Sequence, residues 1–118
     1  MMTFEELLKV QWAEYADRHR DRVNLLIHVV AVPLFWIGSF NAIGALLFSG
    51  LFYALGGVVL AALSLFAQGI GHDREALQPQ AFAGAWDFVQ RVVAEQFVTF
   101  PRFVISGGWL RNLEASSR

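Results

Sequence analysis

The chain has 118 residues, of which 56% are hydrophobic and only 16% charged, so it is more apolar than an average soluble domain. This length accommodates a single domain, and a formal net charge of −1 offers no basic excess for binding nucleic acid. Because the sequence has no cysteine, disulfides, thiolate metal sites and a cysteine nucleophile are excluded. Imidazole and carboxylate groups remain as metal ligands.

The first predicted element is an amphipathic helix over residues 4–19. Thr3 followed by Glu6 is a capping-box pattern, and apolar side chains then recur at helical spacing. The charged residues of this segment indicate a helix that lies on the membrane or on the bundle and does not cross. Since this N-terminus is acidic and amphipathic, we do not expect a cleavable signal peptide.

Residues 23–72 contain no Asp, Glu, Lys or Arg, which leaves room for two membrane spans of about 20 residues each. The best turn is Ser49-Gly50, and it predicts helices over 22–48 and 51–71. A break or kink at 38–41 is the alternative. A strip of small residues on the second helix would allow close helix packing or a homo-oligomer: Gly57, Ala61 and Ser64.

The last predicted element is a helix over residues 82–110 that Pro101 interrupts or kinks. Residues 103–110 are short and apolar, so we expect them to be re-entrant or interfacial, with a full third span as the alternative. Two sets of residues recur at helical spacing on different faces of this segment: the apolar Trp86, Val89, Val93 and Phe97, and the charged Asp87, Arg91 and Glu95.

All nine Lys and Arg residues lie outside residues 23–72, and the turn between the two spans carries none. By the positive-inside rule, we expect both ends of the chain and its active site to face the cytoplasm. The expected fold is an all-α integral membrane bundle of four to five helices, a single domain over residues 1–118 built around a central transmembrane hairpin.

The three histidines of the chain are predicted to converge. An antiparallel hairpin brings the start of the first span beside the end of the second, so His28 and His72 meet at one membrane face. His19 lies just before the turn into that face. Imidazoles with one carboxylate and no sulfur suit iron, zinc or manganese. The alternative is that the histidines are only interface anchors or packing residues.

Several neighbours of the histidines are expected to support them. Tyr15 and Asn24 each precede a histidine by four residues, and there they would fix the orientation of its ring. Near the third histidine, Gln68 is expected to contact the site or the substrate, and Asp73 or Glu75 to supply the carboxylate.

The sequence resembles a known membrane family. The segment His19-Arg-Asp-Arg-Val-Asn24-Leu-Leu-Ile-His28, with Pro33 five positions later, is similar to the HxxxxNxxxH…P signature of small membrane proteins related to the fungal iron(II)-dependent 2-hydroxy fatty acid dioxygenase of phytosphingosine metabolism. Residues 68–79 resemble the QxxGH…E…P segment of that family, although Glu75 follows His72 by three residues where the family usually has four. The resemblance spans residues 15–103 and includes the late proline-aromatic step at Pro101 and Phe103.

This resemblance implies an iron(II) centre held by His19, His28 and His72. It also implies binding of a 2-hydroxy fatty acid through its hydroxyl and carboxylate, and α-oxidation with O₂ to the acid one carbon shorter. The acyl tail would remain among the spans while the head reaches the metal. Four arginines near the expected mouth would either attract the carboxylate or anchor the protein at lipid phosphates: Arg18, Arg20, Arg22 and Arg74.

Two other functions remain open on the sequence alone. One is another metal-dependent membrane lipid hydroxylase or hydrolase on the same ligands. The other is a non-enzymatic helical membrane protein whose histidines serve only as anchors. Metal content and O₂ dependence separate these three alternatives.

Overall fold

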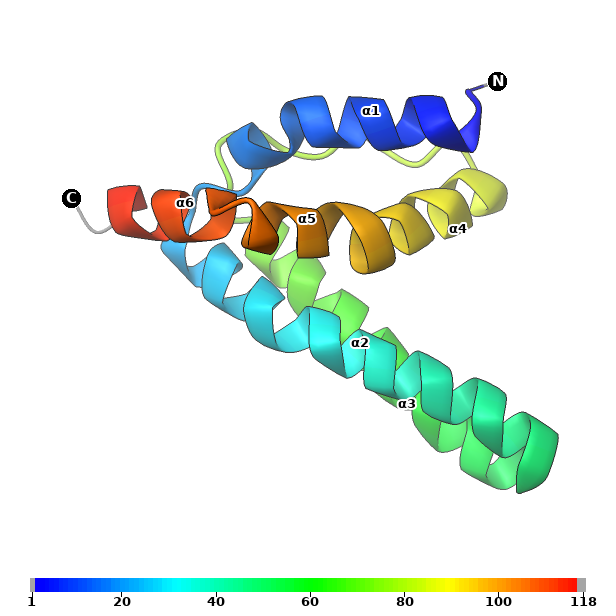
Figure 1. The fold of residues 1–118 in the computed structure, drawn as a ribbon. Helices are drawn as coiled ribbons and strands as arrows, with labels where there is room; N and C mark the ends of the chain where they lie inside the picture. Colours follow the sequence, from blue (N-terminus) through cyan, green and yellow to red (C-terminus); the bar gives the residue numbers. More distant parts are fainter. Residues whose placement is uncertain (1, 117–118) are drawn as a thin grey trace.

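The computed structural model describes residues 2–116, and over that range the chain is helical with no strand (Figure 1). The all-α prediction is confirmed. The elements in chain order are α1 (Phe4–Tyr15), a 3-10 turn η1 (Ala16–Arg18), α2 (Arg22–Phe48), α3 (Leu51–His72), α4 (Ala85–Ala94), a π-helical turn η2 (Glu95–Thr99), α5 (Phe100–Ile105) and α6 (Gly108–Ser116).

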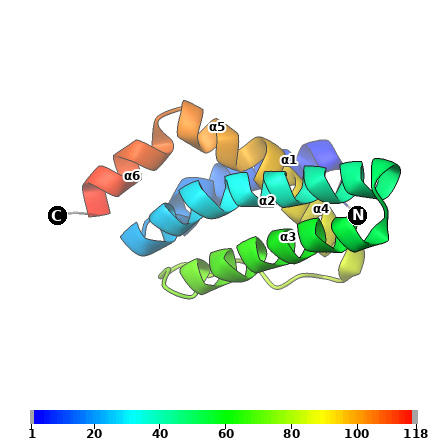
Figure 2. The ribbon, with the colours of Figure 1, turned by 90° about the horizontal axis from the view of Figure 1, so that it is seen from below.

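Helices α2 and α3 form an antiparallel hairpin and lie side by side along their length (Figure 2). Asp21 caps α2 by accepting a hydrogen bond from the backbone N–H of Asn24, and α2 runs without a break through residues 38–41. The turn falls at Gly50, whose φ of 108° lies in the left-handed region that favours glycine. The hairpin therefore begins, turns and ends where the sequence pattern predicts.

The two hairpin helices approach each other closely where glycines face each other. A Cβ atom on Gly57 would lie 2.5 Å from the carbonyl oxygen of Gly38 and 2.6 Å from the backbone nitrogen of Ala42. The small-residue strip of α3 thus serves packing within the chain, because Gly57 and the buried Ser64 lie against α2.

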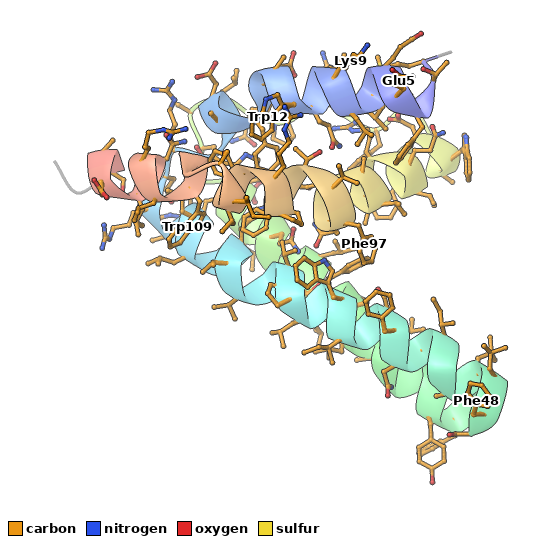
Figure 3. All side chains as sticks on the ribbon, viewed as in Figure 1. Glu5, Lys9, Trp12, Phe48, Phe97 and Trp109 are labelled. Carbon is orange, nitrogen blue, oxygen red and sulfur yellow. The ribbon has the colours of Figure 1, made fainter. Side chains whose placement is uncertain are left out.

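Both hairpin helices are long and apolar enough to cross a membrane, at about 40 Å for α2 and about 33 Å for α3. At the turn between them, no other helix of residues 2–116 covers their side chains: Phe48 is 88% exposed and Phe52 is 81% exposed. Figure 3 shows Phe48 projecting from the tip of the hairpin. A core helix of a soluble protein would be mostly covered by its neighbours. This exposure fits a hairpin surrounded by lipid.

The remaining helices lie across the other end of the hairpin, away from its turn (Figure 1). Helix α1 is shorter than the predicted 4–19, because the chain tightens into η1 after Tyr15 and leaves His19 outside the helix. A small core joins these elements: Tyr15, Leu25, Val32, Phe100 and Phe103.

The helix predicted over 82–110 begins later than expected and is broken once. Gly84, with φ 149°, delays its start to Ala85, and Gly107, with φ 86°, ends it before α6. Pro101 does not break it, because the wide turn η2 lies directly before the proline, where a regular α-helix would bring its ring against a carbonyl. Residues 103–110 do not form one continuous helix, because α5 ends at Ile105 and α6 begins at Gly108. The indole N–H of Trp109 donates to the carbonyl of Leu25, at 2.9 Å, and holds α6 against α2.

The close contact in the hairpin yields a stability prediction. Substituting Gly57→Ala should destabilise the protein by about 1–3 kcal/mol, since the added methyl group collides with the backbone of α2. Gly56→Ala is the matched control, because a Cβ there meets nothing within 4 Å. Unfolding of both variants by SDS titration in mixed micelles measures the difference. Equal stability of the two variants would contradict the contact.

Candidate metal centre

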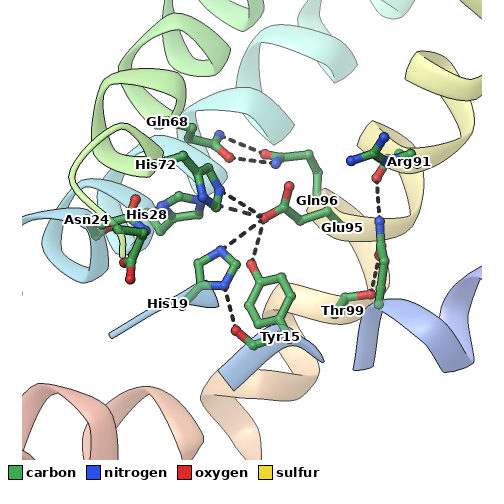
Figure 4. A network of polar contacts seen from close by, with 12 residues as sticks. Tyr15, His19, Asn24, His28, Gln68, His72, Arg91, Glu95, Gln96 and Thr99 are labelled. Atoms are coloured by element: carbon green, nitrogen blue, oxygen red, sulfur yellow. Dashed lines mark hydrogen bonds and ion pairs between the residues drawn. The ribbon is translucent and has the colours of Figure 1, made fainter. Parts of the chain in front are cut away.

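Three imidazoles and one carboxylate converge at the polar end of the hairpin (Figure 4). Their ligand atoms all lie within 4.8 Å of one another. His19 follows η1, His28 lies on α2, His72 ends α3, and Glu95 begins η2. The Oε2 atom of Glu95 is 3.5 Å from Nε2 of His19, 3.5 Å from Nε2 of His28 and 4.0 Å from Nε2 of His72.

Backbone carbonyls one helical turn earlier orient two of the rings. Nδ1 of His19 donates to the carbonyl of Tyr15 at 2.7 Å, and Nδ1 of His28 donates to the carbonyl of Asn24 at 3.0 Å. Because Nδ1 of each ring is used in this way, Nε2 is the nitrogen that faces the centre and is placed to bind a metal ion.

The unpartnered nitrogens fit a bound cation. Nε2 of His19 and Nε2 of His28 are buried and have no hydrogen-bond partner, which costs about 1–3 kcal/mol for each such group. A metal ion between them and Glu95 would satisfy both atoms. Three nitrogen ligands, one carboxylate and no sulfur suit iron(II), zinc or manganese.

Tyr15 holds the carboxylate in place. Its hydroxyl donates to Oε2 of Glu95 at 2.8 Å, and its ring stacks on His19 with centroids 3.7 Å apart. Burial and the negative charge of Glu95 raise the pKa of Tyr15 well above its usual range, so the hydroxyl keeps its proton. Burial tends to raise the pKa of Glu95, yet the imidazoles of His19 and His28 hold that pKa well below its usual range. The carboxylate is therefore ionised and ready to bind a cation.

A pair of buried amides fixes the turn that carries Glu95. Gln68 and Gln96 exchange two hydrogen bonds, at 2.9 Å and 2.7 Å, between α3 and η2. The indole N–H of Trp36 on α2 donates to the carbonyl of Gln96 at 2.6 Å. Gln68 thus acts on the centre through its partner, which is adjacent to Glu95.

The carboxylate expected from Glu75 or Asp73 comes from Glu95 instead. Glu75 is buried, and its oxygens accept from the backbone N–H groups of Arg20 and Asp21, at 2.9 Å and 3.0 Å, and from the amide of Asn24, at 2.7 Å. It therefore ties the loop after α3 to the start of α2. Asp73 is exposed, and neither acid belongs to the group of converging ligands.

Asn24 supports the site from α2 and depends on a glycine of α3. Its carbonyl orients His28, and its side-chain amide holds Glu75. A Cβ on Gly71 would lie 2.2 Å from the Oδ1 atom of Asn24, whereas a Cβ on Gly69 would meet nothing within 4 Å. Of these two glycines of α3, only Gly71 is required for the close approach to Asn24.

Glu95 was placed by its spacing on the charged face of the last helix, together with Asp87 and Arg91. The first pair forms, with Nη1 of Arg91 3.3 Å from Asp87, while the carboxylate of Glu95 turns inward to the histidines. One signal pointed to this residue: it is the only acidic residue between positions 88 and 113.

A cavity of about 640 Å³ leads to the centre from the side of α1 and α4. His19, His72 and Glu95 line it. The rest of the lining combines apolar residues, among them Leu7, Val10 and Trp86, with polar and charged ones, among them Gln11, Gln90 and Arg91. This volume is in the range of small-molecule sites, about 300–1,000 Å³.

The comparisons with protein-family models, curated proteins and solved structures found no match to this chain.

The ligand set yields a prediction about metal content. The wild type purified without oxygen and loaded with iron(II) should hold about one ion per chain, and His19→Ala, His28→Ala, His72→Ala and Glu95→Gln should each lose most of it. Glu75→Gln is the matched control, since its carboxylate serves the backbone and the amide of Asn24. Metal analysis by mass spectrometry measures the ratio. Full retention in Glu95→Gln with loss in Glu75→Gln would contradict the assignment.

Proposed function

We propose that the protein is an iron(II)-dependent dioxygenase that shortens 2-hydroxy fatty acids by one carbon. The observation that carries this proposal is the convergence of three imidazoles and the Glu95 carboxylate beside a cavity that is lined in part by apolar side chains. The resemblance of residues 15–103 to the dioxygenase family supports the choice of substrate.

The proposed reaction balances with O₂ as the only co-substrate. The bond between the carboxyl carbon and the hydroxyl-bearing carbon breaks, and the products are the shorter acid, CO₂ and water. The substrate gives up four electrons, which reduce one O₂. Bound iron(II) would supply the one-electron chemistry by which O₂ reacts with a closed-shell acid.

The residues of this chain would hold the metal and shape its surroundings. His19, His28, His72 and Glu95 are the proposed ligands, and the carbonyls of Tyr15 and Asn24 fix the rings of the first two. The hydroxyl of Tyr15 keeps Glu95 in place and stays protonated. The apolar side chains that line part of the cavity would exclude bulk water from the reacting head of the substrate.

The proposal includes an orientation in the membrane. The site lies at the end of the hairpin where the basic residues gather, while the far turn at residues 49–50 has none. By the positive-inside rule, the site and both ends of the chain face the cytoplasm.

Turnover tests the proposed function. Iron-loaded wild type should consume O₂ on addition of a 2-hydroxy fatty acid and release the acid one carbon shorter, detected by mass spectrometry, and His72→Ala should abolish both. The unhydroxylated acid of the same length is the substrate control. Product formed equally well without O₂ would favour a hydrolase on the same ligands. No bound metal and no turnover would favour a non-enzymatic helical protein.

A further inference from the structure

Two cavities offer space for an acyl chain, and only one of them reaches the centre. The first, of about 640 Å³, lies between α1, α4 and the loop before α4, and it ends at His19, His72 and Glu95. The second, of about 460 Å³, is an apolar groove on the outer face of the hairpin, lined by residues 23–34 of α2 and 60–67 of α3. None of the four converging ligands lines this groove.

The space between the two spans is closed. Gly38 and Gly57 bring the backbones of α2 and α3 together, so a single Cβ at either position would collide with the other helix. Beyond this contact, the buried amides of Gln68 and Gln96 lie between the hairpin and η2. A tail that ran from the centre between the spans would therefore meet the Gly38–Gly57 contact.

The first cavity has the polarity that a fatty acid requires. Its middle is lined by Leu7 and Val10 of α1 and by Ala81, Ala85 and Trp86 from the opposite wall. Met2 and Trp86 also line the cavity, and both are exposed, so they present apolar surface where the cavity opens. The part of α4 that lines the cavity is mixed: Ala85 and Trp86 are apolar, whereas Asp87, Gln90 and Arg91 are polar or charged. The tail is therefore expected to lie against Trp86 and the apolar residues of α1.

One of the four arginines near the site lines this cavity. Arg18 directly precedes His19, its side chain is only 16% exposed, and Glu14 holds it at 3.2 Å. The other three face different partners: Arg20 pairs with Asp17, Arg74 pairs with Asp21, and Arg22 donates to the carbonyl of Leu113. The Arg18 guanidinium contacts Glu14 through Nε and Nη2 and donates from Nη1 to the carbonyl of Gln78. Since a guanidinium has five N–H donors and these contacts use three of them, two remain for a carboxylate beside the centre.

We propose that the fatty acid enters between α1 and α4, so that its tail lies along Leu7, Val10 and Trp86 and its carboxylate meets Arg18 beside the metal ligands. This inference rests on the proposed function and differs from the expectation that the tail remains among the spans. The occupant is an acid with an apolar chain, because the same cavity contains the converging ligands, the Arg18 guanidinium and the apolar side chains of Leu7, Val10 and Trp86.

Photo-cross-linking locates the tail without turnover. The iron-loaded wild type in lipid nanodiscs is given a 2-hydroxy fatty acid with a diazirine at the end of its tail, under strict exclusion of O₂. We expect labelled peptides from residues 2–11 or 79–91, and an excess of unlabelled 2-hydroxy acid should remove the label. Competed labelling at residues 23–34 or 60–67, or no competed labelling, would overturn the proposal.

A bulky side chain in the cavity should change the preference for chain length. Val10→Trp narrows the α1 wall, and we expect kcat/KM for a long-chain acid to fall about tenfold relative to a short-chain acid. Leu63→Trp in the outer groove is the matched control and should leave that ratio unchanged. Bound iron per chain verifies that both variants keep the centre. The opposite result in the two variants would place the tail on the hairpin.

A second pair of variants tests the carboxylate contact. Arg18→Gln should raise KM about tenfold with a smaller effect on kcat, since it removes a charge-assisted contact to the substrate. Arg20→Gln is the control, because Arg20 is 69% exposed and lies outside the cavity lining. Equal KM values in the two variants would remove Arg18 from the proposal.

Failure of this inference can be told from failure of the proposed function. If the wild type converts 2-hydroxy acids but the label and both variant pairs behave as in the controls, the function stands and the location of the tail is wrong. If the wild type converts no 2-hydroxy acid under any loading, the proposed function fails, and competed labelling still reports where an acyl chain binds.

Discussion

Oε2 of Glu95 lies within 4.0 Å of an Nε2 atom from each of the three histidines, and this contact requires four segments of the chain to hold their places together. Two of these nitrogens are buried without hydrogen-bond partners, which costs about 1–3 kcal/mol each. If these positions served only to pack the core, apolar side chains there would give a more stable fold. A fold that keeps such groups unpaired and oriented at one point has the character of a binding centre.

The hairpin supplies the rigidity that the centre needs. Because Gly38 and Gly57 allow the backbones to touch, His28 on α2 is fixed relative to His72 at the end of α3. Glu75 then ties the loop after α3 to the backbone at the start of α2. On the opposite side, the amide pair of Gln68 and Gln96 secures η2 against α3. Each of these contacts crosses between elements, so displacement of one element disturbs several ligands.

The sequence predicts the hairpin and the histidine cluster because both follow from local patterns. An uncharged stretch of known length sets the spans at 22–48 and 51–71, and antiparallel pairing then brings His28 to His72. Glu95 could not be chosen in this way, since its inward direction depends on how α4 and η2 pack against α1 and α3. The sequence favours Asp73 and Glu75 as the carboxylate ligand because they are the acids nearest to His72. In the structure, however, Glu75 accepts hydrogen bonds from three other donors. The π-helical turn likewise has no simple local signature beyond the proline that follows it.

The position of the centre at the end of the spans determines what can reach it. Farther along the hairpin, the lipid-facing side chains are apolar and the helices touch, so a polar head would find no partner there. Beyond the last turns of the hairpin, water would surround the whole ligand and an acyl tail would lose its apolar contacts. The cavity between α1 and α4 lies between these limits, because one end carries the converging ligands and the other carries exposed apolar side chains. An amphiphile can therefore present its head to the metal ligands while its tail remains covered, and this requires both amphipathic helices to lie beside the hairpin.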